Sequence, residues 1–242
     1  MLLALWSPKG GSGTSVVAAA MALVSAGRQE TRLADFGGDQ PAILGLTPSP
    51  STTVAAGSSE GLTGWLAAGP STPTECLDEM SVPVVSGLAL LPRGFDIGAD
   101  RLPEDAGAAL SVALRDCGIG ILDAGPSRGG DHGAGFAAIE VADAALMVIR
   151  PCYLALRRAV ADPRLARSAG AILVEDPGRA LDASDVAAVL GVPVVGRVPV
   201  RAEIARAVDA GVLRDRLPNP LATAAAAVLD RVAHLGGGRW AA

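Results

Sequence analysis

The feature that most constrains the fold is a regular alternation of short apolar runs with longer helix-like runs along almost the whole chain. The apolar runs predict strands at 2–6, 31–35, 88–92, 119–123, 143–149, 170–175 and 192–198. The intervening runs predict helices at 14–27, 103–116, 135–142, 153–168, 182–190, 201–210 and 218–234. Several strands are continuously apolar, as expected of strands buried on both faces of a parallel sheet. The pattern therefore predicts a doubly wound α/β fold with a mainly parallel sheet flanked by helices.

The length and composition of the chain fit one large domain. We expect this domain at 1–235, because half of the 242 residues are hydrophobic and can form a substantial core. The segment 47–60 is rich in Ser, Thr, Pro, Gly and Ala without periodicity, which predicts a mobile surface loop. Residues 61–68 are expected to form a short helix carrying Trp65. The tail 236–242 follows the last predicted helix and is expected to be disordered.

Composition also argues against several classes of protein. No apolar run approaches the roughly 20 residues that span a membrane. The apolar N-terminus lacks a basic region and is predicted to be the first strand, not a signal peptide. Three widely spaced cysteines without a CxxC pair argue against a zinc or iron–sulfur site and favour a reducing, cytoplasmic location. The net charge of −5 gives no general attraction to nucleic acid or anionic lipid.

A glycine-rich turn joins the first predicted strand to the first predicted helix and reads SPKGGSGTS from Ser7 to Ser15. Such a turn points backbone N–H groups at one spot, where the helix dipole adds positive potential. Lys9 is the only lysine of the chain, and the other 19 of its 20 basic residues are arginines. A compact ammonium suits a tight phosphate loop better than a wide guanidinium. The turn therefore predicts a phosphate-binding site.

Two strands end in aspartate. Asp35 ends the second predicted strand and is followed by Phe-Gly-Gly-Asp39, while Asp123 ends the fourth and is followed by Ala-Gly-Pro126. An aspartate that ends a strand beside a phosphate loop is suited to ordering Mg²⁺ and its water. The plainer alternatives are a turn with favourable Asp and Gly residues around Asp35 and a simple strand end at Asp123.

The loop resembles the deviant Walker A motif, KGGxGK[ST], of the ParA/MinD superfamily of P-loop ATPases. In that family the early lysine, which Lys9 matches, reaches across an ATP-sandwiched dimer to the nucleotide of the partner. The resemblance implies that Mg²⁺ meets the Ser15 hydroxyl. Segments at 141–151, 190–199 and 207–211 resemble later family elements in the same order, so the resemblance extends from residue 1 to about 217. The residues implied to hold the phosphates of ATP or ADP are Lys9, Gly10, Gly11, Ser12, Gly13, Thr14 and Ser15.

The chain departs from the family motif at one position. Ordinary P-loops carry a second lysine, which would stand at position 14, where this chain has Thr14. A hydrogen bond to a charged group is worth roughly 1.5–3 kcal/mol, so its loss is expected to weaken nucleotide binding roughly 10- to 150-fold. Phosphoryl transfer depends on charge neutralisation, so hydrolysis should suffer at least as much. We therefore expect at best a weak ATPase.

The resemblance also gives roles to the acidic residues. Asp35 matches the first carboxylate of switch I, close to Mg²⁺, and Asp123 with Pro126 matches a DxxP form of Walker B. The second switch I carboxylate of the family often lies two residues on, at Gly37 here, and Asp39 could replace it. Residues 127–133, with His132, would form switch II. The implied catalytic residues are Lys9, Asp35, Asp39 and Asp123, and the implied Mg²⁺ ligands are Ser15, Asp35 and Asp123.

By resemblance the chain is a nucleotide-dependent homodimer that positions or organises a cellular machinery, with a protein partner. The nearest branches are those of pilus assembly (CpaE/TadZ-like) and septum-site determination, beside relatives in DNA segregation. The alternatives are a pseudo-ATPase scaffold that binds partners without nucleotide, and an ATP-dependent ligase of the same fold. The usual base-recognition residue is not evident at 174–179.

Two further surfaces are weighed and not favoured. Arginines between 157 and 216 could bind DNA non-specifically, but acidic residues among them favour an ordinary solvated face. The last predicted helix lacks both the basic face and the bulky apolar face of a membrane-surface helix, so no membrane anchor is expected.

Overall fold

The computed structural model describes residues 1–46, 61–69, 71–94, 105–115, 118–127 and 134–235. The predicted mobile loop at 47–60 and the predicted tail at 236–242 lie outside the described residues. The same holds for 128–133, which is most of the predicted switch II and includes His132.

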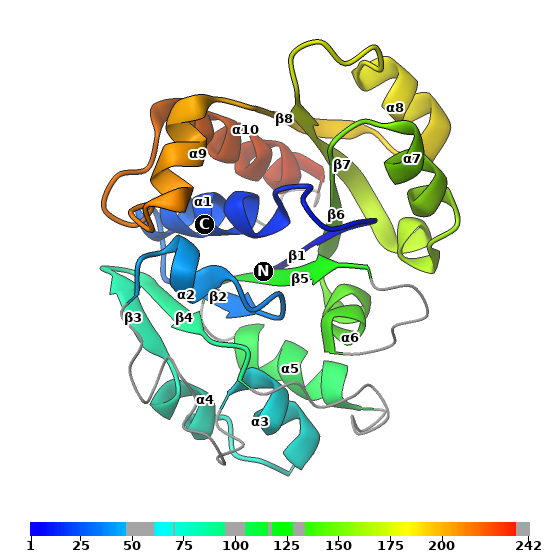
Figure 1. The fold of residues 1–242 in the computed structure, drawn as a ribbon. Coiled ribbons are helices and arrows are strands. Elements are labelled where there is room, and N and C mark those ends of the chain that lie inside the picture. Colours follow the sequence, from blue (N-terminus) through cyan, green and yellow to red (C-terminus); the bar gives the residue numbers. More distant parts are fainter. Residues whose placement is uncertain (47–60, 70, 95–104, 116–117, 128–133, 236–242) are drawn as a thin grey trace.

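The described strands form one eight-stranded sheet in the order β3-β4-β2-β5-β1-β6-β7-β8 (Figure 1). All neighbours pair in parallel except the edge strand β3, which is antiparallel to β4. The mainly parallel α/β sheet predicted from the alternation of apolar runs is therefore confirmed. The strands are β1 (Leu2–Ser7), β2 (Thr31–Asp35), β3 (Val82–Val85), β4 (Leu88–Leu91), β5 (Ile119–Pro126), β6 (Ala144–Ile149), β7 (Ser168–Glu175) and β8 (Val194–Pro199).

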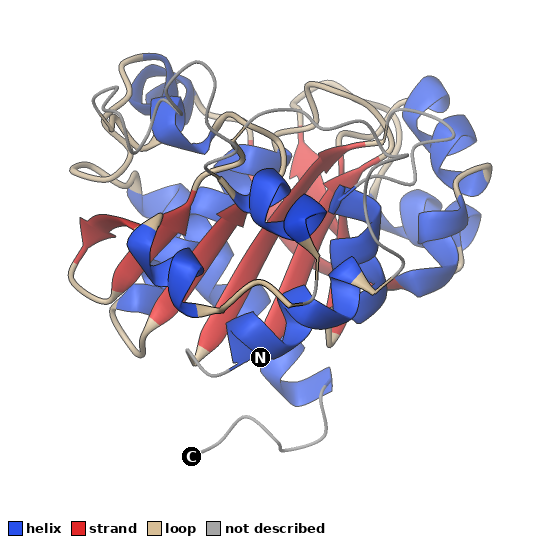
Figure 2. Cartoon of the chain, turned by 90° about the horizontal axis from the view of Figure 1, so that it is seen from below, coloured by secondary structure: helices blue, strands red, loops and turns tan. Residues whose placement is uncertain are grey.

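Helices cover both faces of this sheet, and the strands form a central layer (Figure 2). One face packs against α1 (Thr14–Ala26), α2 (Gln40–Ile43), α9 (Ala202–Asp209) and α10 (Asn219–Leu235). The other packs against α3 (Leu62–Ala68), α4 (Glu75–Glu79), α5 (Ala106–Arg115), α6 (Ala134–Val141), α7 (Tyr153–Val160) and α8 (Ala183–Leu190). Strand β1 supplies alternate residues to the two cores, Leu3 and Leu5 to the first and Leu2, Ala4 and Trp6 to the second, all fully buried. This central position explains why the strand is continuously apolar.

The structure differs from the prediction along 153–168 and at β3. The helix expected at 153–168 ends as α7 at Val160, because Asp162 and Pro163 begin a short 3-10 helix (Pro163–Arg167) in which the Asp162 carboxylate accepts from Arg164 N. Proline disfavours the helical conformation in the residue before it, so the long helix cannot continue. The strand β3 was not predicted, because Pro83 interrupts its apolar run. Proline is tolerated in β3 because β3 lies at the sheet edge.

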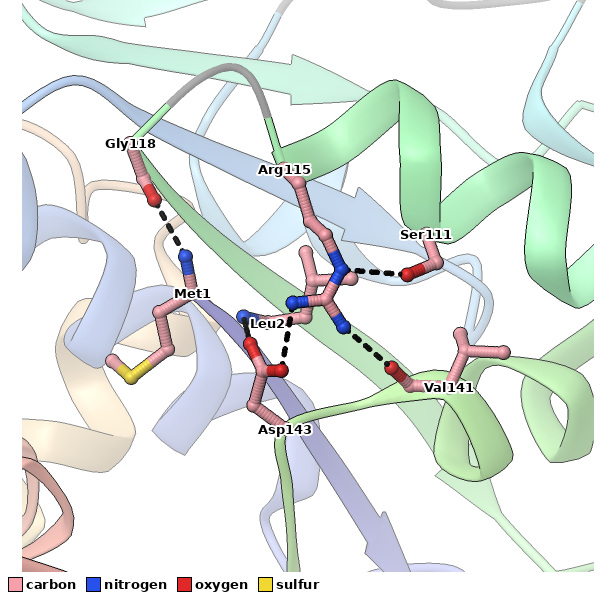
Figure 3. A network of polar contacts seen from close by, with 7 residues as sticks. All are labelled: Met1, Leu2, Ser111, Arg115, Gly118, Val141 and Asp143. Atoms are coloured by element: carbon pink, nitrogen blue, oxygen red, sulfur yellow. Dashed lines mark hydrogen bonds and ion pairs between the residues drawn. The ribbon is translucent and has the colours of Figure 1, made fainter. Parts of the chain in front are cut away.

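Asp143 stabilises the amino-terminal ends of the central strands through a network of polar contacts (Figure 3). Its carboxylate accepts from Leu2 N at 2.8 Å and pairs with Arg115 at 2.7 Å. Arg115 also reaches Ser111 and the Val141 carbonyl, and the Met1 amino group donates to the Gly118 carbonyl. This network lies at the starts of β1, β5 and β6. The glycine-rich turn follows the carboxyl end of β1. Asp143 and its neighbours therefore stabilise the opposite ends of the strands from the candidate site.

Candidate functional site

The glycine-rich turn closes the carboxyl end of β1 and opens α1. Gly13 is the N-cap of α1 in the left-handed conformation, with φ of +87°, which an L side chain rarely adopts. Ser7 Oγ and Ser12 Oγ both donate to the Lys9 carbonyl at 3.0 Å and hold the loop in shape. A Cβ added at Gly10 would meet no atom within 4 Å. The loop backbone therefore borders open space.

That space belongs to a cleft of about 630 Å³. Its walls are the loop with the start of α1 on one side, and α2 with the segment 208–211 at the end of α9 on the other. The two elements of the second wall touch, because a Cβ added at Gly45 would overlap the Gly211 carbonyl oxygen. Of the residues predicted to hold phosphate, the cleft is lined by Gly10, Gly11, Ser12, Gly13, Thr14 and Ser15, together with the predicted catalytic residue Asp39.

Asp35 and Asp123 meet beneath this cleft, Asp35 at the end of β2 and Asp123 within β5, which continues past the predicted end at Asp123 to Pro126. They are register partners in the β2–β5 pairing, and neither is exposed to solvent. Asp35 accepts from Gly38 N at 2.6 Å and from Gln40 N at 3.1 Å. Asp123 accepts from Gly125 N at 3.2 Å and from the Gln40 side chain at 2.7 Å. The structure thus brings together the two strand-end carboxylates that the sequence singled out.

Burial dominates the electrostatics of this pair. Burial, followed by the neighbouring charge of Asp123, raises the pKa of Asp35 to about 7, while the two backbone hydrogen bonds act in the opposite direction. Burial also raises the pKa of Asp123, while hydrogen bonds from Gln40 and Ser15 act in the opposite direction. Exposed Asp39 adds a repulsive charge to both carboxylates. Because desolvation and like charge disfavour ionisation, a cation beside the pair would stabilise its ionised form and lower both pKa values.

Gln40 is a site residue that the sequence did not indicate. It is the first residue of α2 and is fully buried. Its Nε2 donates to the Ser15 carbonyl at 2.9 Å and to Asp123 Oδ2 at 2.7 Å, while its backbone N–H reaches Asp35. One residue thus connects the loop helix, the end of β2 and the middle of β5. The only signal in the sequence is its place directly after Asp39 and before Pro41.

Two buried polar atoms at the site have no partner in the described protein, namely Thr14 Oγ1 and Gln40 Oε1. Thr14 occupies the position of the missing lysine and is only 5 % exposed. Buried polar atoms are nearly always hydrogen-bonded, so an unpartnered hydroxyl beside an open loop indicates a site that is completed by a ligand. Lys9 is partly exposed, and its Nζ donates to the Gly10 carbonyl at 3.3 Å, within its own loop.

Gly37 faces the centre of the site. A Cβ added there would lie 3.3 Å from Asp123 Oδ2 and 3.4 Å from Ser15 Oγ. Gly37 stands where the resembled family often carries its second switch I carboxylate. A side chain at this position would therefore point at Asp123 and at the Ser15 hydroxyl. Asp39 is exposed and lies further along the same segment, on the wall of the cleft.

The residues present fit a nucleotide phosphate with Mg²⁺. The loop offers an open cradle and an unpartnered hydroxyl, and the Ser15 side chain hydrogen-bonds to buried Asp123, the register partner of Asp35. Hard oxygen donors of this kind suit Mg²⁺, which usually keeps several of its own waters. Within the described ranges, no cluster of three or more His, Cys, Asp or Glu side chains could hold a metal alone. A cation here would therefore depend on water or phosphate oxygens as well.

A buried arginine joins the candidate site to the far side of the sheet. Arg164 is 4 % exposed, lies 5.7 Å from the ring centres of Trp6 and Phe136, and pairs with Asp162 at 3.1 Å. Its Nη2 donates to Ser127 Oγ at 2.7 Å. Ser127 follows β5 and donates its N–H to the Ser7 carbonyl at 2.7 Å. The start of the predicted switch II is therefore fixed both to the loop and to Arg164.

The structure also bears on the two surfaces weighed above. Arg164 is buried and cannot belong to a DNA-binding face, and Arg167 and Arg214 form ion pairs with Glu140 and Asp215. These pairs agree with a solvated, locally neutralised surface. None of the helices described here has both the length and the apolar character needed to cross a bilayer.

A second cleft, of about 370 Å³, lies at the ends of β7 and β8. Asp176 at its rim accepts from Arg150 at 2.7 Å and from Arg179 at 3.2 Å, and these bonds lower the Asp176 pKa. This second cleft is lined by 175–179, within the segment 174–179 where the usual base-recognition residue of the resembled family is not evident. That segment is adjacent to the loop, because a Cβ added at Gly13 would lie 3.9 Å from Val174 Cγ2.

Comparison with known proteins finds likeness only at the level of structure. No protein-family model and no curated protein sequence matches the chain. A ParA family ATPase from Chlorobium tepidum is 22% identical with a TM-score of 0.73, and the match covers 96% of this chain and 98% of that one. The septum site-determining protein MinD from Pyrococcus horikoshii, solved with Mg-ADP, is 16% identical with a TM-score of 0.74 over 98% and 97%.

The MinC:MinD cell division protein complex from Aquifex aeolicus is 18% identical with a TM-score of 0.68 over 96% and 95% of the two chains. The matches span nearly the full length of both partners, so the likeness concerns the whole architecture and not one motif. The chain has the fold of the ParA/MinD P-loop ATPases.

Proposed function

We propose that this chain binds ATP or ADP with Mg²⁺ and acts as a nucleotide-dependent homodimer that positions or organises a cellular machinery. The observation that carries the proposal is the meeting of the buried Asp35–Asp123 pair with Ser15 at the mouth of an open phosphate loop. Gly10 to Ser15 hold the phosphates, and Ser15, Asp35 and Asp123 order Mg²⁺. When bound, the ion neutralises phosphate charge and relieves the repulsion between the two carboxylates.

Hydrolysis is proposed to be weak or absent. Thr14 supplies a hydroxyl where an ammonium would stabilise the phosphates, and Gly37 leaves the centre of the site without a further carboxylate. Asp39 is the nearest candidate to replace it, although its exposure makes it the weaker catalytic group. Binding and dimer formation can persist without fast turnover, because they need the cradle and the cation more than they need a catalytic base.

Lys9 is assigned to the partner's nucleotide. Its ammonium contacts only the adjacent Gly10 carbonyl among the described hydrogen bonds, and it is free to extend from the rim of the loop. Because it is the only lysine, reductive ¹³C-methylation places reporters on Lys9 Nζ and on the terminal amine alone. The Lys9 methyl resonance should shift when ATP drives dimerisation.

The likeness to MinD and ParA proteins supports a role in placing other proteins, and we place the chain near the pilus-assembly (CpaE/TadZ-like) or septum-site branch, in the cytoplasm, with a protein partner. The paired arginines do not favour DNA as that partner. Thr14 and Gly37 also support the alternative of a pseudo-ATPase scaffold that engages its partner without nucleotide.

Calorimetric titration with Mg-ATP measures nucleotide binding, and light scattering after size-exclusion chromatography measures the molar mass. Together they test the proposal. We expect heat of binding and a doubling of mass with ATP, and Lys9→Ala should bind nucleotide while remaining monomeric. Arg28→Ala, at an exposed ion pair away from the cleft, is the matched control. No heat at millimolar Mg-ATP and no change of mass would favour the scaffold.

A further inference from the structure

The side-chain amide of Gln40 has only one orientation that fits its surroundings. Nε2 lies 2.7 Å from Asp123 Oδ2 and 2.9 Å from the Ser15 carbonyl, so both of its hydrogens point at acceptors. Turning the amide over would place Oε1 against those same two acceptors, with no hydrogen between them. The hydrogen-bond network therefore fixes the direction in which Oε1 points.

Oε1 is left as a buried acceptor to which no described residue donates. Gln40 is fully buried, so open solvent does not satisfy this atom. A buried acceptor without a donor is costly and rare in folded proteins. Since the described part of the chain supplies no donor, a small molecule that enters the site is the natural donor.

We propose that Gln40 is a positioning residue of the cation site, whose Oε1 accepts a hydrogen bond from a water molecule carried by hydrated Mg²⁺. This inference rests on the proposed function, because it assumes that Mg²⁺ enters with the nucleotide. The Asp35–Asp123 pair attracts the cation, and Mg²⁺ keeps several polarised waters that are strong donors. At the same time Nε2 keeps Asp123 oriented and joined to the helix of the phosphate loop.

The chemistry of the amide suits this task. A carboxylate at position 40 would add a third buried negative charge to two acids that already repel each other. A neutral amide offers an acceptor to the water and a donor to Asp123 without that repulsion. Gln40 is also the first residue of α2, so a bond to the cation's water ties the position of α2 to metal occupancy.

The test measures how strongly Mg²⁺ improves nucleotide binding, without reference to hydrolysis. The dissociation constant of ATP is determined by calorimetry in excess Mg²⁺ and again in EDTA, and the ratio of the two values reports the coupling. Gln40→Met keeps the length of the side chain but removes acceptor and donors. Gln29→Met changes the only other glutamine, which is exposed and outside the cleft, and serves as the matched control.

We expect Gln40→Met to reduce the coupling ratio about tenfold, while the dissociation constant in EDTA changes less than about twofold. An unchanged or larger ratio beside a normal wild type would overturn this inference and leave the proposed function standing. A wild type that binds no nucleotide would overturn both. If Gln40→Met does not fold, Gln40→Asn, which keeps the amide but shortens its reach, should lower the ratio in the same direction.

Discussion

Asp35 and Asp123 are register partners on neighbouring parallel strands, and both are completely buried. Their hydrogen bonds come from backbone N–H groups and neutral side chains, while burial raises the pKa of both carboxyls. The site is therefore built around two acids whose negative charge the surrounding groups only partly stabilise. A pair of this kind should influence stability, metal binding and pH dependence together.

The stability of the ligand-free protein should fall as the pH rises through the pKa of Asp35. That pKa is about 7 in the folded protein and 3.8 ordinarily, so the folded state binds the proton more tightly. This contribution is full below about pH 4 and is lost by about pH 7, with an upper size of about 4 kcal/mol. Asp35→Asn should therefore stabilise the ligand-free protein at pH 8 and flatten this dependence, as measured by urea unfolding.

The same substitution should remove the benefit of Mg²⁺ for nucleotide binding. Asp215→Asn, at an exposed ion pair, is the control and should alter neither property appreciably. Wild type and Asp35→Asn share all other titrating groups, so the difference between their free energies of unfolding reports Asp35 alone. If that difference does not change between pH 4 and 7, the expected raised pKa of Asp35 is contradicted.

Thr14→Lys should strengthen ATP binding by roughly 10- to 150-fold, because it restores a charged donor to the phosphate cradle. Thr14 is buried against the cleft, and its hydroxyl has no partner in the described protein. Thr14→Val removes that hydroxyl at nearly constant shape and should weaken binding instead. Calorimetry of the two variants gives opposite signs if Thr14 faces the phosphates, and equal changes would show that it does not.

Gly37→Asp should raise the rate of ATP hydrolysis, by as much as about 10²-fold if the new carboxylate acts on the attacking water. The added side chain would point toward Asp123 Oδ2 and Ser15 Oγ, and the φ angle of Gly37 is not in the left-handed region. Gly37→Asn has the same size without the charge and is the control. Steady-state phosphate release measures both, and equal rates would indicate that the cation site lacks more than a carboxylate.

Arg164→Met should destabilise the protein by about 3–5 kcal/mol, because it leaves Asp162 without its buried partner. Ser127→Ala removes one hydrogen bond to the same guanidinium and should cost about 1.5–3 kcal/mol. Chemical unfolding measures both. Since Arg164 contacts Ser127 and Ser127 contacts Ser7, the double variant should be less than additive.

The sheet was predictable because buried parallel strands are continuously apolar, and the loop was predictable because few residues permit its geometry. Strand β3 was not predicted because Pro83 interrupts its apolar run, although an edge strand tolerates proline. The helix expected through residue 168 ends earlier, because Asp162 and Pro163 do not allow it to continue. Local sequence patterns thus indicate elements well where burial is uniform and poorly where one residue interrupts them.

The meeting of Asp35 and Asp123 was also predictable, since neighbouring parallel strands bring their carboxyl-terminal parts together, although β5 continues past Asp123 to Pro126. The contributions of Gln40 and Arg164 were not. Gln40 reaches Asp123 and Ser15 only because α2 starts above them, and Arg164 is buried only because a short 3-10 helix places it beside Trp6. Such contacts depend on how distant segments meet, which no local pattern records.

The backbone contact between Gly45 and Gly211 has a mechanical consequence for the cleft. The two segments touch where no side chain separates them, so α2 cannot move outward without pushing the segment that follows α9. Should the proposed nucleotide move Gln40, this contact would pass the shift of α2 to the segment between α9 and α10. A partner bound at that segment would then respond to the nucleotide without touching it.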